Sequence, residues 1–446
     1  MTTESTVSLE VDDIQAPLLH PRPTRYAGAA ILARIDDQQD GRELLRRLIP
    51  FVLSATGSPE PDRAAWAAVA LSFQGLKALG VPEDTLASFP PEFQQGMAAR
   101  AAELGDTGES APEQWEPPLG GPNVHLVIYA LAPDGPSLEA TLAGALDALR
   151  QIPGVAPIWR QDTYMLPTER TSFGFKDGIS NPAIEGSGIP GTNSREEPFK
   201  AGEFILGYPN EMGQLPPMPK PEVLGRNGSY VVFRKLQTRV AEYRRYLRAN
   251  AKSREEEELL AAKFVGRWAS GAPLLLAPER DDPELGGDPA RNNAFLYAAD
   301  GDARGLKCPL GAHARRAYAR DSRITGVARN HRIIRRSTSY GPMLPKDVLE
   351  DDGAHRGILF VCLQAQLARQ FEFVKTQWIN EGTFFGTPAE IDPLVGPNDG
   401  TGPFTIPQEP IRRRVTELPQ FVVNRGGEYC FMPGLRALRW LADLDT

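Results

Sequence analysis

The chain has 446 residues, a length that fits two or three domains and can bury a sizeable core. Hydrophobic residues make up 41% of it and charged residues 24%, which excludes a wholly disordered chain. The formal net charge of −8 argues against a general binder of nucleic acid or of anionic membranes.

The first half of the sequence alternates between predicted strands and helices, and it predicts a compact α+β unit that ends near residue 170. Periodicity and turn residues define its elements. The second helix of this unit is alanine-rich and is expected to start near Pro61 and Asp62. In chain order the elements are a strand at 26–35, helices at 41–53, 63–73 and 93–104, a Gly/Pro-rich loop at 105–122, a strand at 123–132, a helix at 137–152 and a strand around 155–166.

The second half repeats this theme, which suggests an internal duplication. Its elements are a strand at 227–236, a helix or helix pair at 240–268 with many i, i+4 charge pairs, a strand at 357–365 and a helix at 366–380. Two long segments, roughly 171–227 and 270–345, lack periodicity. Loops of that length in a compact domain are usually functional, so we expect the chemistry there.

Cysteine and histidine are scarce. The three cysteines, Cys308, Cys362 and Cys430, are odd in number and far apart, so they form neither a disulfide framework nor a paired zinc site. The N-terminus resembles no export signal, and no apolar run approaches the ~20 residues that span a bilayer. We therefore expect a cytoplasmic protein without membrane partners. With five histidines and no i, i+4 pair, any metal site is expected to use a single histidine.

The first candidate site is the loop Gly174-Phe175-Lys176-Asp177-Gly178. Two glycines free the backbone on both sides of one carboxylate, so that it can approach a ligand closely. Because Phe173 and Phe175 would exclude water from Asp177, we expect its pKa to rise and its proton to exchange near neutral pH. The alternative is a Lys-Asp-Gly turn on the surface.

The second candidate is His313, in CPLGAHARRAYAR. Its small neighbours leave room beside the imidazole for something flat and bulky, and one histidine suffices as the axial ligand of a haem iron in a peroxidase. A structural histidine is the alternative. Three following arginines, Arg315, Arg316 and Arg320, are candidates to meet carboxylates of such a group, or else form a solvated basic face.

The third candidate is the basic run at 329–336, in the segment VARNHRIIRRSTSYG at 327–341. Strand alternation places Arg332, Ile334 and Arg336 on one face and Arg335 on the other, beside Ile333. We therefore expect Arg335 to point inward, toward an anionic partner, and Arg336 to point outward. The alternative is an exposed phosphate-binding patch.

Taken together, these segments resemble the dye-decolourising peroxidase family, in particular its longer branch, which includes the fungal enzymes. The resemblance covers most of the chain. Its motifs occur in the family's order, whereas the sequence has no GxGxxG, P-loop, GxSxG or CxxCH motif. They are DIQAPLL at 13–19, GFKDG at 174–178, GEFILGYPNE at 202–211, NGSYVVFRKL at 227–236, KFVGRWASGAPL at 263–274, CPLGAHARRAYAR at 308–320, HRIIRRSTSYG at 331–341 and the segment 357–380.

The resemblance implies an α+β fold with two ferredoxin-like domains of antiparallel sheets and peripheral helices, at 1–200 and 201–446. It implies haem b, held mainly by the second domain, and oxidation of dyes, phenols and other bulky aromatic reductants by hydrogen peroxide. In the family's pattern Asp177 is the distal acid/base, His313 the proximal iron ligand, and Arg335 the distal arginine, with Arg332 as second choice. Such an arginine stabilises the charge that develops on peroxide.

Other assignments also follow from the resemblance. Asp392 is expected to accept the second N–H of His313. Leu359 and Phe360 are expected to line the distal side, with ordinary strand core as the alternative. From their positions alone, Trp378 and Tyr340 are candidates for surface residues that relay electrons from bulky dyes, which cannot easily enter a closed haem pocket.

The sequence departs from the family at one point and leaves other interpretations open. The family's longer branch carries Asn-Pro where Tyr318-Ala319 stand here, which puts the local turn in doubt and leaves His313 in place. A non-enzymatic haem carrier or sensor with the same pocket is one alternative function. A module that binds anions or nucleic acid through the 329–336 arginines is another. The sequence does not decide whether the protein forms a homo-oligomer.

Overall fold

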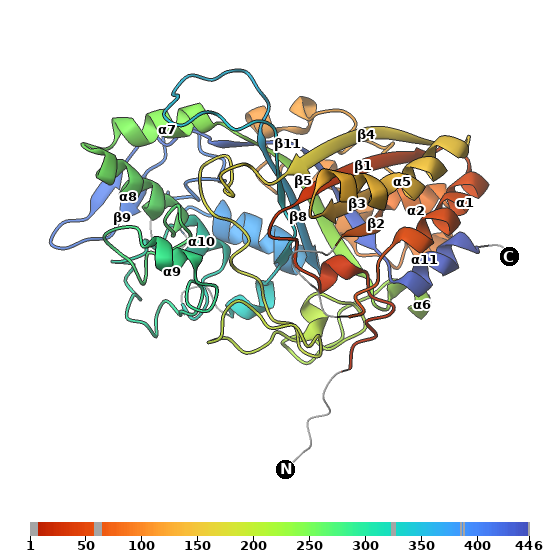
Figure 1. Cartoon of the computed structure of the whole chain (residues 1–446). Coiled ribbons are helices and arrows are strands. Elements are labelled where there is room, and N and C mark those ends of the chain that lie inside the picture. The colour runs from red at the N-terminus through yellow and green to blue at the C-terminus, as the bar shows by residue number, and fades with distance from the viewer. Residues whose placement is uncertain (1–7, 58–64, 323–326, 384–385, 387–388, 445–446) are drawn as a thin grey trace, which may run out of the picture.

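A curled antiparallel sheet organises the chain (Figure 1). The computed structural model describes residues 8–57, 65–322, 327–383, 386 and 389–444. In the main sheet the strand order is β4-β1-β3-β2-β11-β5-β8-β6, with β7 also paired to β8, and β9 and β10 form a separate hairpin. The strands are β1 Ala27–Ile35, β2 Trp66–Ser72, β3 Leu126–Ala132, β4 Val155–Tyr164, β5 Ser229–Thr238, β6 Ile334–Arg335, β7 Thr338–Tyr340, β8 Gly357–Gln364, β9 Phe404–Ile406, β10 Arg413–Val415 and β11 Val422–Met432.

Helices cover the sheet, and several begin at side chains that cap them. Asp37, Asp134 and Ser253 accept the first backbone N–H groups of α1, α5 and α8. The α-helices are α1 Gln38–Leu48, α2 Phe73–Ala78, α3 Glu83–Leu86, α4 Pro91–Gln95, α5 Gly135–Gln151, α6 Glu222–Gly225, α7 Val240–Ala249, α8 Arg254–Val265, α9 Pro283–Gly287, α10 His313–Ala317 and α11 Leu435–Ala442. Two π-helical stretches, η9 Ala368–Glu372 and η10 Val374–Ile379, follow β8.

The predicted α+β class with antiparallel strands is confirmed, and the predicted strands are present as β1, β3, β4, β5 and β8. The helix predicted at 63–73 is wrong: residues 66–72 form β2, and the expected start near Pro61 and Asp62 lies outside the described residues. Every residue of β2 is buried, because the strand lies between β3 and β11. This pairing overrides the helix propensity of its alanines.

Three other elements differ from the prediction. The helix predicted at 93–104 is only α4 and a 3-10 turn, since Gly96 has a φ of 78° and ends α4. The helix predicted at 366–380 is π-helical. The long strand β11 and the helix α11 were not predicted.

The two halves of the chain contribute the two ends of the sheet. β1 to β4 lie at one end and β5 to β8 at the other, and the last strand, β11, joins β2 to β5. The sheet curls so that one face of each half packs into a shared core. The hydroxyl of Tyr129 in β3 spans this core and donates to the carbonyl of Arg336 at 2.7 Å. The predicted division at residues 200 and 201 stays a prediction.

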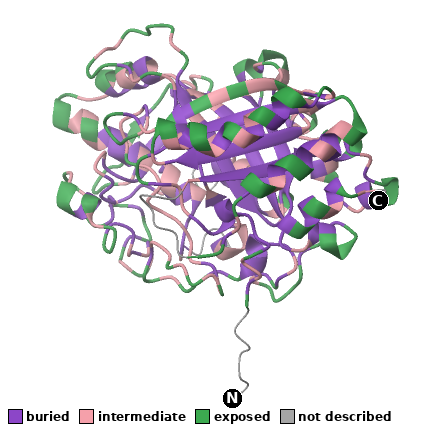
Figure 2. Ribbon diagram, turned by 45° about the vertical axis from the view of Figure 1, so that its right-hand side comes forward, coloured by how far each residue is buried: buried purple, intermediate pink, exposed green. Residues whose placement is uncertain are grey.

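The outer faces of the two halves differ. On the first half, α1, α5 and α11 pack directly against the strands, and Figure 2 shows buried strands beneath helices with exposed outer faces. On the second half, α7, α8, α10 and the π-helical segment lie around the outer face of β5 and β8 (Figure 1). A cavity lies between these elements and the sheet.

Candidate active site

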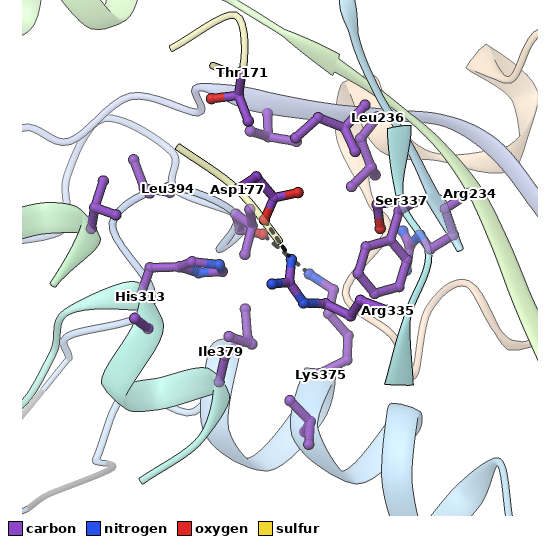
Figure 3. Close-up of a pocket in the computed structure, with 18 of the residues that line it drawn as sticks. Thr171, Asp177, Arg234, Leu236, His313, Arg335, Ser337, Lys375, Ile379 and Leu394 are labelled. Atoms are coloured by element: carbon purple, nitrogen blue, oxygen red, sulfur yellow. Dashed lines mark hydrogen bonds and ion pairs between the residues drawn. The ribbon is translucent and has the colours of Figure 1, made fainter. Parts of the chain in front are cut away.

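The cavity has a volume of about 320 Å³ and brings together residues that are far apart in the sequence. Its walls come from the GFKDG loop, from β5, β6, β8 and β11, from α10 and from the π-helical segment. In Figure 3, His313 lies on one side, and Asp177 and Arg335 lie on the opposite side. Both long aperiodic segments therefore contribute to one site, as predicted.

His313 is the first residue of α10, and its ring points into the cavity (Figure 3). Its Nδ1 lies 2.8 Å from Oδ2 of Asp392. Asp392 is fully buried, and its other oxygen accepts the backbone N–H groups of Leu394 and Val395 at 2.9 Å each. With Nδ1–H donated to the carboxylate, Nε2 carries the free lone pair that faces the cavity.

The ionisation of Asp392 agrees with this arrangement. Burial alone would raise the pKa of Asp392, but the neighbouring His313 and the N–H of Val395 hold it below its ordinary value. Asp392 is therefore an anion at neutral pH and can fix both the tautomer and the orientation of the imidazole. The predicted contact between these two residues is confirmed.

Asp177 and Arg335 form an ion pair across the cavity from His313. Nη1 of Arg335 donates to Oδ1 of Asp177 at 3.2 Å. The glycines on both sides of Asp177, Gly174 and Gly178, have φ of 90° and 82°, conformations that favour glycine. The turn at 174–178 therefore forms a wall of the cavity, and the alternative of a simple surface turn does not hold.

The expected rise in the pKa of Asp177 is wrong. Burial does raise it, but Arg335, Arg22 and the N–H of Gly178 outweigh burial and lower the pKa to about 2. Phe173 and Phe175 line the cavity too, but they also pack against the apolar cluster around Tyr243 and Phe264, and the burial of Asp177 does not outweigh these charges. Asp177 is therefore an ionised acceptor of protons at neutral pH.

Strand alternation correctly places Arg335 in the cavity, but Arg336 does not point to solvent. Arg336 is 4% exposed and donates to the carbonyls of Pro17 and Arg335. The opposite face of β6 packs into the shared core, so an outward-pointing residue there is buried too. Arg332 is also buried, binds Ser180 and lines the cavity. The run at 329–336 is therefore not the exposed anion-binding patch of the alternative interpretation.

Only one of the two predicted residues of β8 lines the cavity. Phe360 faces it, together with Ile358, whereas Leu359 is fully buried in the shared core on the other face of the sheet. Neighbours in a strand point to opposite faces, so Leu359 and Phe360 cannot both line one cavity.

The two predicted relay residues do not lie at the surface. Trp378 and Tyr340 are each 2% exposed. Trp378 packs against His331 and Phe373, and the hydroxyl of Tyr340 donates to the carbonyl of Leu236 at 3.3 Å. A bulky dye at the surface cannot touch either ring.

The three arginines after His313 do not form a solvated face. Arg315 is fully buried against Asp302, and Arg316 donates to backbone carbonyls of 378–390. Only Arg320 lines the cavity.

Where the family's Asn-Pro would stand, Tyr318 also lines the cavity and donates to Glu196 at 2.7 Å. Arg332 stacks over its ring, 4.3 Å from the centroid.

Arg22 and Lys375 are among the charged residues of the site that sequence reasoning missed. Arg22 reaches within 3.7 Å of Oδ2 of Asp177 from 155 positions earlier in the chain, and no local pattern marks it. Lys375 lines the cavity from the π-helical segment, where burial and Arg234 lower its pKa to about 8. Its place in a segment predicted to be a helix gave no signal of this orientation.

The fold and this site are those of a peroxidase. A family model described as the DyP dimeric alpha+beta barrel domain matches residues 31–151, and one described as Dyp-type peroxidase, C-terminal, matches residues 218–384. The chain belongs to the dye-decolourising peroxidase family and is an enzyme of its longer, fungal-type branch.

Particular relatives cover nearly the whole chain. Dye-decolorizing peroxidase msp1 of Mycetinis scorodonius is 33% identical over 83% of this chain and 75% of its own length. Dye-decolorizing peroxidase AauDyP1 of Auricularia auricula-judae is 31% identical over 97% of this chain and 86% of its own. A solved dye-decolorizing peroxidase in complex with 2,6-dimethoxyphenol has a TM-score of 0.83 at 28% identity, covering 97% of this chain and all of that one.

Peroxidases of this family are haem enzymes, and the cavity fits that cofactor. The free Nε2 of His313 faces a space whose walls are largely apolar and include the small residues Ala314 and Ala317. Arg332 has a buried Nε without a hydrogen-bond partner in this wall, and Arg320 lies nearby. An imidazole ligand, room for a flat apolar ring and cations for its carboxylates are what haem requires.

Proposed function

We propose that this enzyme binds haem b and uses hydrogen peroxide to oxidise bulky aromatic reductants, such as dyes and phenols, by one-electron steps. The observation that carries the proposal is the pairing, across one cavity, of the His313–Asp392 contact with the Asp177–Arg335 ion pair. The dye-decolorizing relatives and the phenol complex of a similar structure support the class of reductant.

The proximal side is assigned to His313 and Asp392. His313 would bind the iron through Nε2, and Asp392 would enrich the imidazole in electrons through its Nδ1–H. When bound, haem supplies the redox-active iron and stores the oxidising equivalents that reductants remove one electron at a time. Arg320 and Arg332 are the cavity-wall cations available for its carboxylates.

The distal side is assigned to Asp177 and Arg335. Asp177 is ionised and can accept one proton from hydrogen peroxide at a carboxylate oxygen. It then returns that proton to the oxygen that leaves as water. Arg335 donates hydrogen bonds toward the same space and stabilises the negative charge that develops on the leaving oxygen.

The optical spectrum tests the proposal directly. The purified protein, supplied with haem, should show a Soret band that changes within seconds of one equivalent of hydrogen peroxide. His313→Ala should lose haem affinity, whereas His355→Ala, an exposed histidine outside the cavity, should keep it. A protein that binds haem but reacts with peroxide no faster than free haem would instead be the carrier or sensor.

The remaining expectations stay predictions. All three cysteines are free and buried, which supports the cytoplasmic location expected from the sequence. Among the described residues no helix is long and apolar enough to cross a membrane. The name of the N-terminal family model supports a test for a homo-oligomer by light scattering.

A further inference from the structure

The residues before β1 form an arm, 8–26, that is fixed to both halves of the protein. The side-chain amide of Gln15 makes two hydrogen bonds with the backbone of Val69 in β2, at 2.9 and 3.0 Å, and a third with the carbonyl of Pro433 at 2.8 Å. Further along, the carbonyl of Pro17 accepts from Arg336. The arm is therefore a structural part of the fold, and it ends beside the cavity.

Arg22 is the residue of the arm that reaches the site. Its side chain is 14% exposed, and its guanidinium lies 4.9 Å from the ring centroid of Tyr26. Nη1 donates to the carbonyl of Ser337 at 3.1 Å, next to β6. A Cβ atom at Gly178, whose φ is 82°, would lie 2.9 Å from Nη2, so a side chain there would displace the guanidinium of Arg22. Arg22 is thus closely packed against the backbone that follows Asp177.

The two oxygens of Asp177 are divided between two arginines. Oδ1 accepts from Arg335, which lies in the cavity, at 3.2 Å. Oδ2 faces Arg22, which lies on the arm side, at 3.7 Å. Both charges lower the pKa of Asp177 against the opposing effect of burial. Arg335 has a second task in the proposed reaction, because it also stabilises charge on peroxide, whereas Arg22 has none.

We propose that Arg22 is a positioning residue of the peroxidase reaction, which keeps Asp177 ionised and oriented while Arg335 engages the peroxide. The proposal rests on the acid/base role of Asp177 proposed above. In that step hydrogen peroxide gives one proton to Asp177, and the same proton leaves with the distal oxygen as water. A fixed cation at Oδ2 makes the protonated carboxyl a stronger acid, so the return of the proton is favoured as well.

The charges that face Asp177 come from two elements, Arg335 on β6 and Arg22 on the arm. No other cation among the described residues would replace Arg22. Its removal should therefore raise the pKa of Asp177 and disfavour the ionised carboxylate. The other charged side chains of the cavity wall are bound elsewhere. Lys176 binds the carbonyl of Gly286, Arg332 binds Ser180 and His313 binds Asp392. Arg234 pairs with Asp106, Lys375 binds Asn380, and Arg267 and Arg320 both bind Asn293.

The test is the pH dependence of the reaction between the haem-loaded enzyme and hydrogen peroxide, followed by stopped-flow absorption. In Arg22→Met the acid limb of the second-order rate constant should move upward by about 1–2 pH units. Arg22→Lys, which restores the charge, should lie close to the wild type. Arg25→Met is the matched control, since Arg25 lies on the same arm but is 80% exposed and pairs with Glu169; it should not shift the limb.

A direct titration makes the readout independent of turnover. The infrared carboxylate band that disappears in Asp177→Asn should titrate about 1–2 pH units higher in Arg22→Met than in the wild type. Thermal unfolding and the Soret band show whether each variant is folded. Should Arg22→Met fail to fold, Arg22→Gln gives the same comparison with a polar side chain of similar reach.

The outcomes separate this inference from the proposed function. Asp177→Asn reacting with peroxide at the wild-type rate would remove the acid/base role itself. A slow Asp177→Asn together with an unshifted acid limb in Arg22→Met would refute only the role of Arg22. The double variant Arg22→Met/Asp177→Asn must show no further shift of the acid limb relative to Asp177→Asn, because a shift that persists without Asp177 cannot act through Asp177.

Discussion

Replacing Asp392 by asparagine changes the one atom that faces His313. In the wild type, Oδ2 accepts from Nδ1 of His313 at 2.8 Å, while Oδ1 accepts the N–H groups of Leu394 and Val395. In Asp392→Asn the single amide oxygen cannot serve both sides. If it stays on the two backbone N–H groups, the amide nitrogen faces Nδ1 and favours a proton on Nε2, the atom that would bind iron.

The size of the effect follows from the contact that is lost. A hydrogen bond to a charged group contributes about 1.5–3 kcal/mol, and Asp392 is fully buried, so solvent does not screen it. Loss of a carboxylate partner of a metal-bound histidine typically costs about 10–100-fold in metal affinity, which is roughly 1.4–2.7 kcal/mol. We therefore expect haem affinity to fall about 10–100-fold and the iron reduction potential to rise, because the imidazole becomes a weaker electron donor.

Haem titration into the haem-free protein, followed at the Soret band, measures the affinity, and a spectroelectrochemical titration measures the potential. Asp399→Asn is the matched control, because Asp399 lies seven residues after Asp392, is exposed and accepts hydrogen bonds from Thr401. Wild-type affinity and potential in Asp392→Asn would refute the reasoning, since the carboxylate would then not hold the imidazole in its tautomer.

Three further predictions concern the walls of the site. Leu359→Ala should cost about 2–5 kcal/mol of stability in urea unfolding and leave the haem spectrum unchanged, whereas Phe360→Ala should change that spectrum; the reverse pattern would contradict the assigned faces of β8. Tyr318→Phe should lower stability by about 1 kcal/mol, because its hydrogen bond to Glu196 is lost. Because the folded pKa of Asp177 is depressed to about 2, its contribution to stability is present above pH ~4 and lost as the pH falls toward 2. The difference in unfolding free energy between wild type and Asp177→Asn should therefore shrink over that range.

The sequence was informative where chemistry depends on a local motif. Asp177 was found from its flanking glycines, His313 from its small neighbours, and Arg335 from alternation in a short strand combined with the family pattern. Each of these signals lies within a few residues of the side chain concerned, so it needs no knowledge of the rest of the fold. Asp392, 79 residues from His313, required the resemblance.

The errors have a common physical cause, which is pairing between distant segments. Residues 66–72 have helical propensity, yet their place between two strands makes them β2. Strand β11 was not recognised in the sequence because it contains the adjacent glycines Gly426 and Gly427. They lie at an irregularity in its pairing with β5. The position of Arg22 beside Asp177 and the burial of Arg336 depend on how the arm crosses the sheet. Nothing in the sequence around either residue encodes that crossing.

The place of β11 has a consequence for how the chain is made. Although β11 is the last strand in sequence, it lies in the middle of the sheet, between β2 and β5. Residues 422–432 must therefore leave the ribosome before β2 and β5 gain their second partner, and until then each of these two strands has one unpaired edge. Val422 and Asn424 of this strand also line the cavity. The pocket is thus completed only once β11 has been synthesised, after all the other strands of the main sheet.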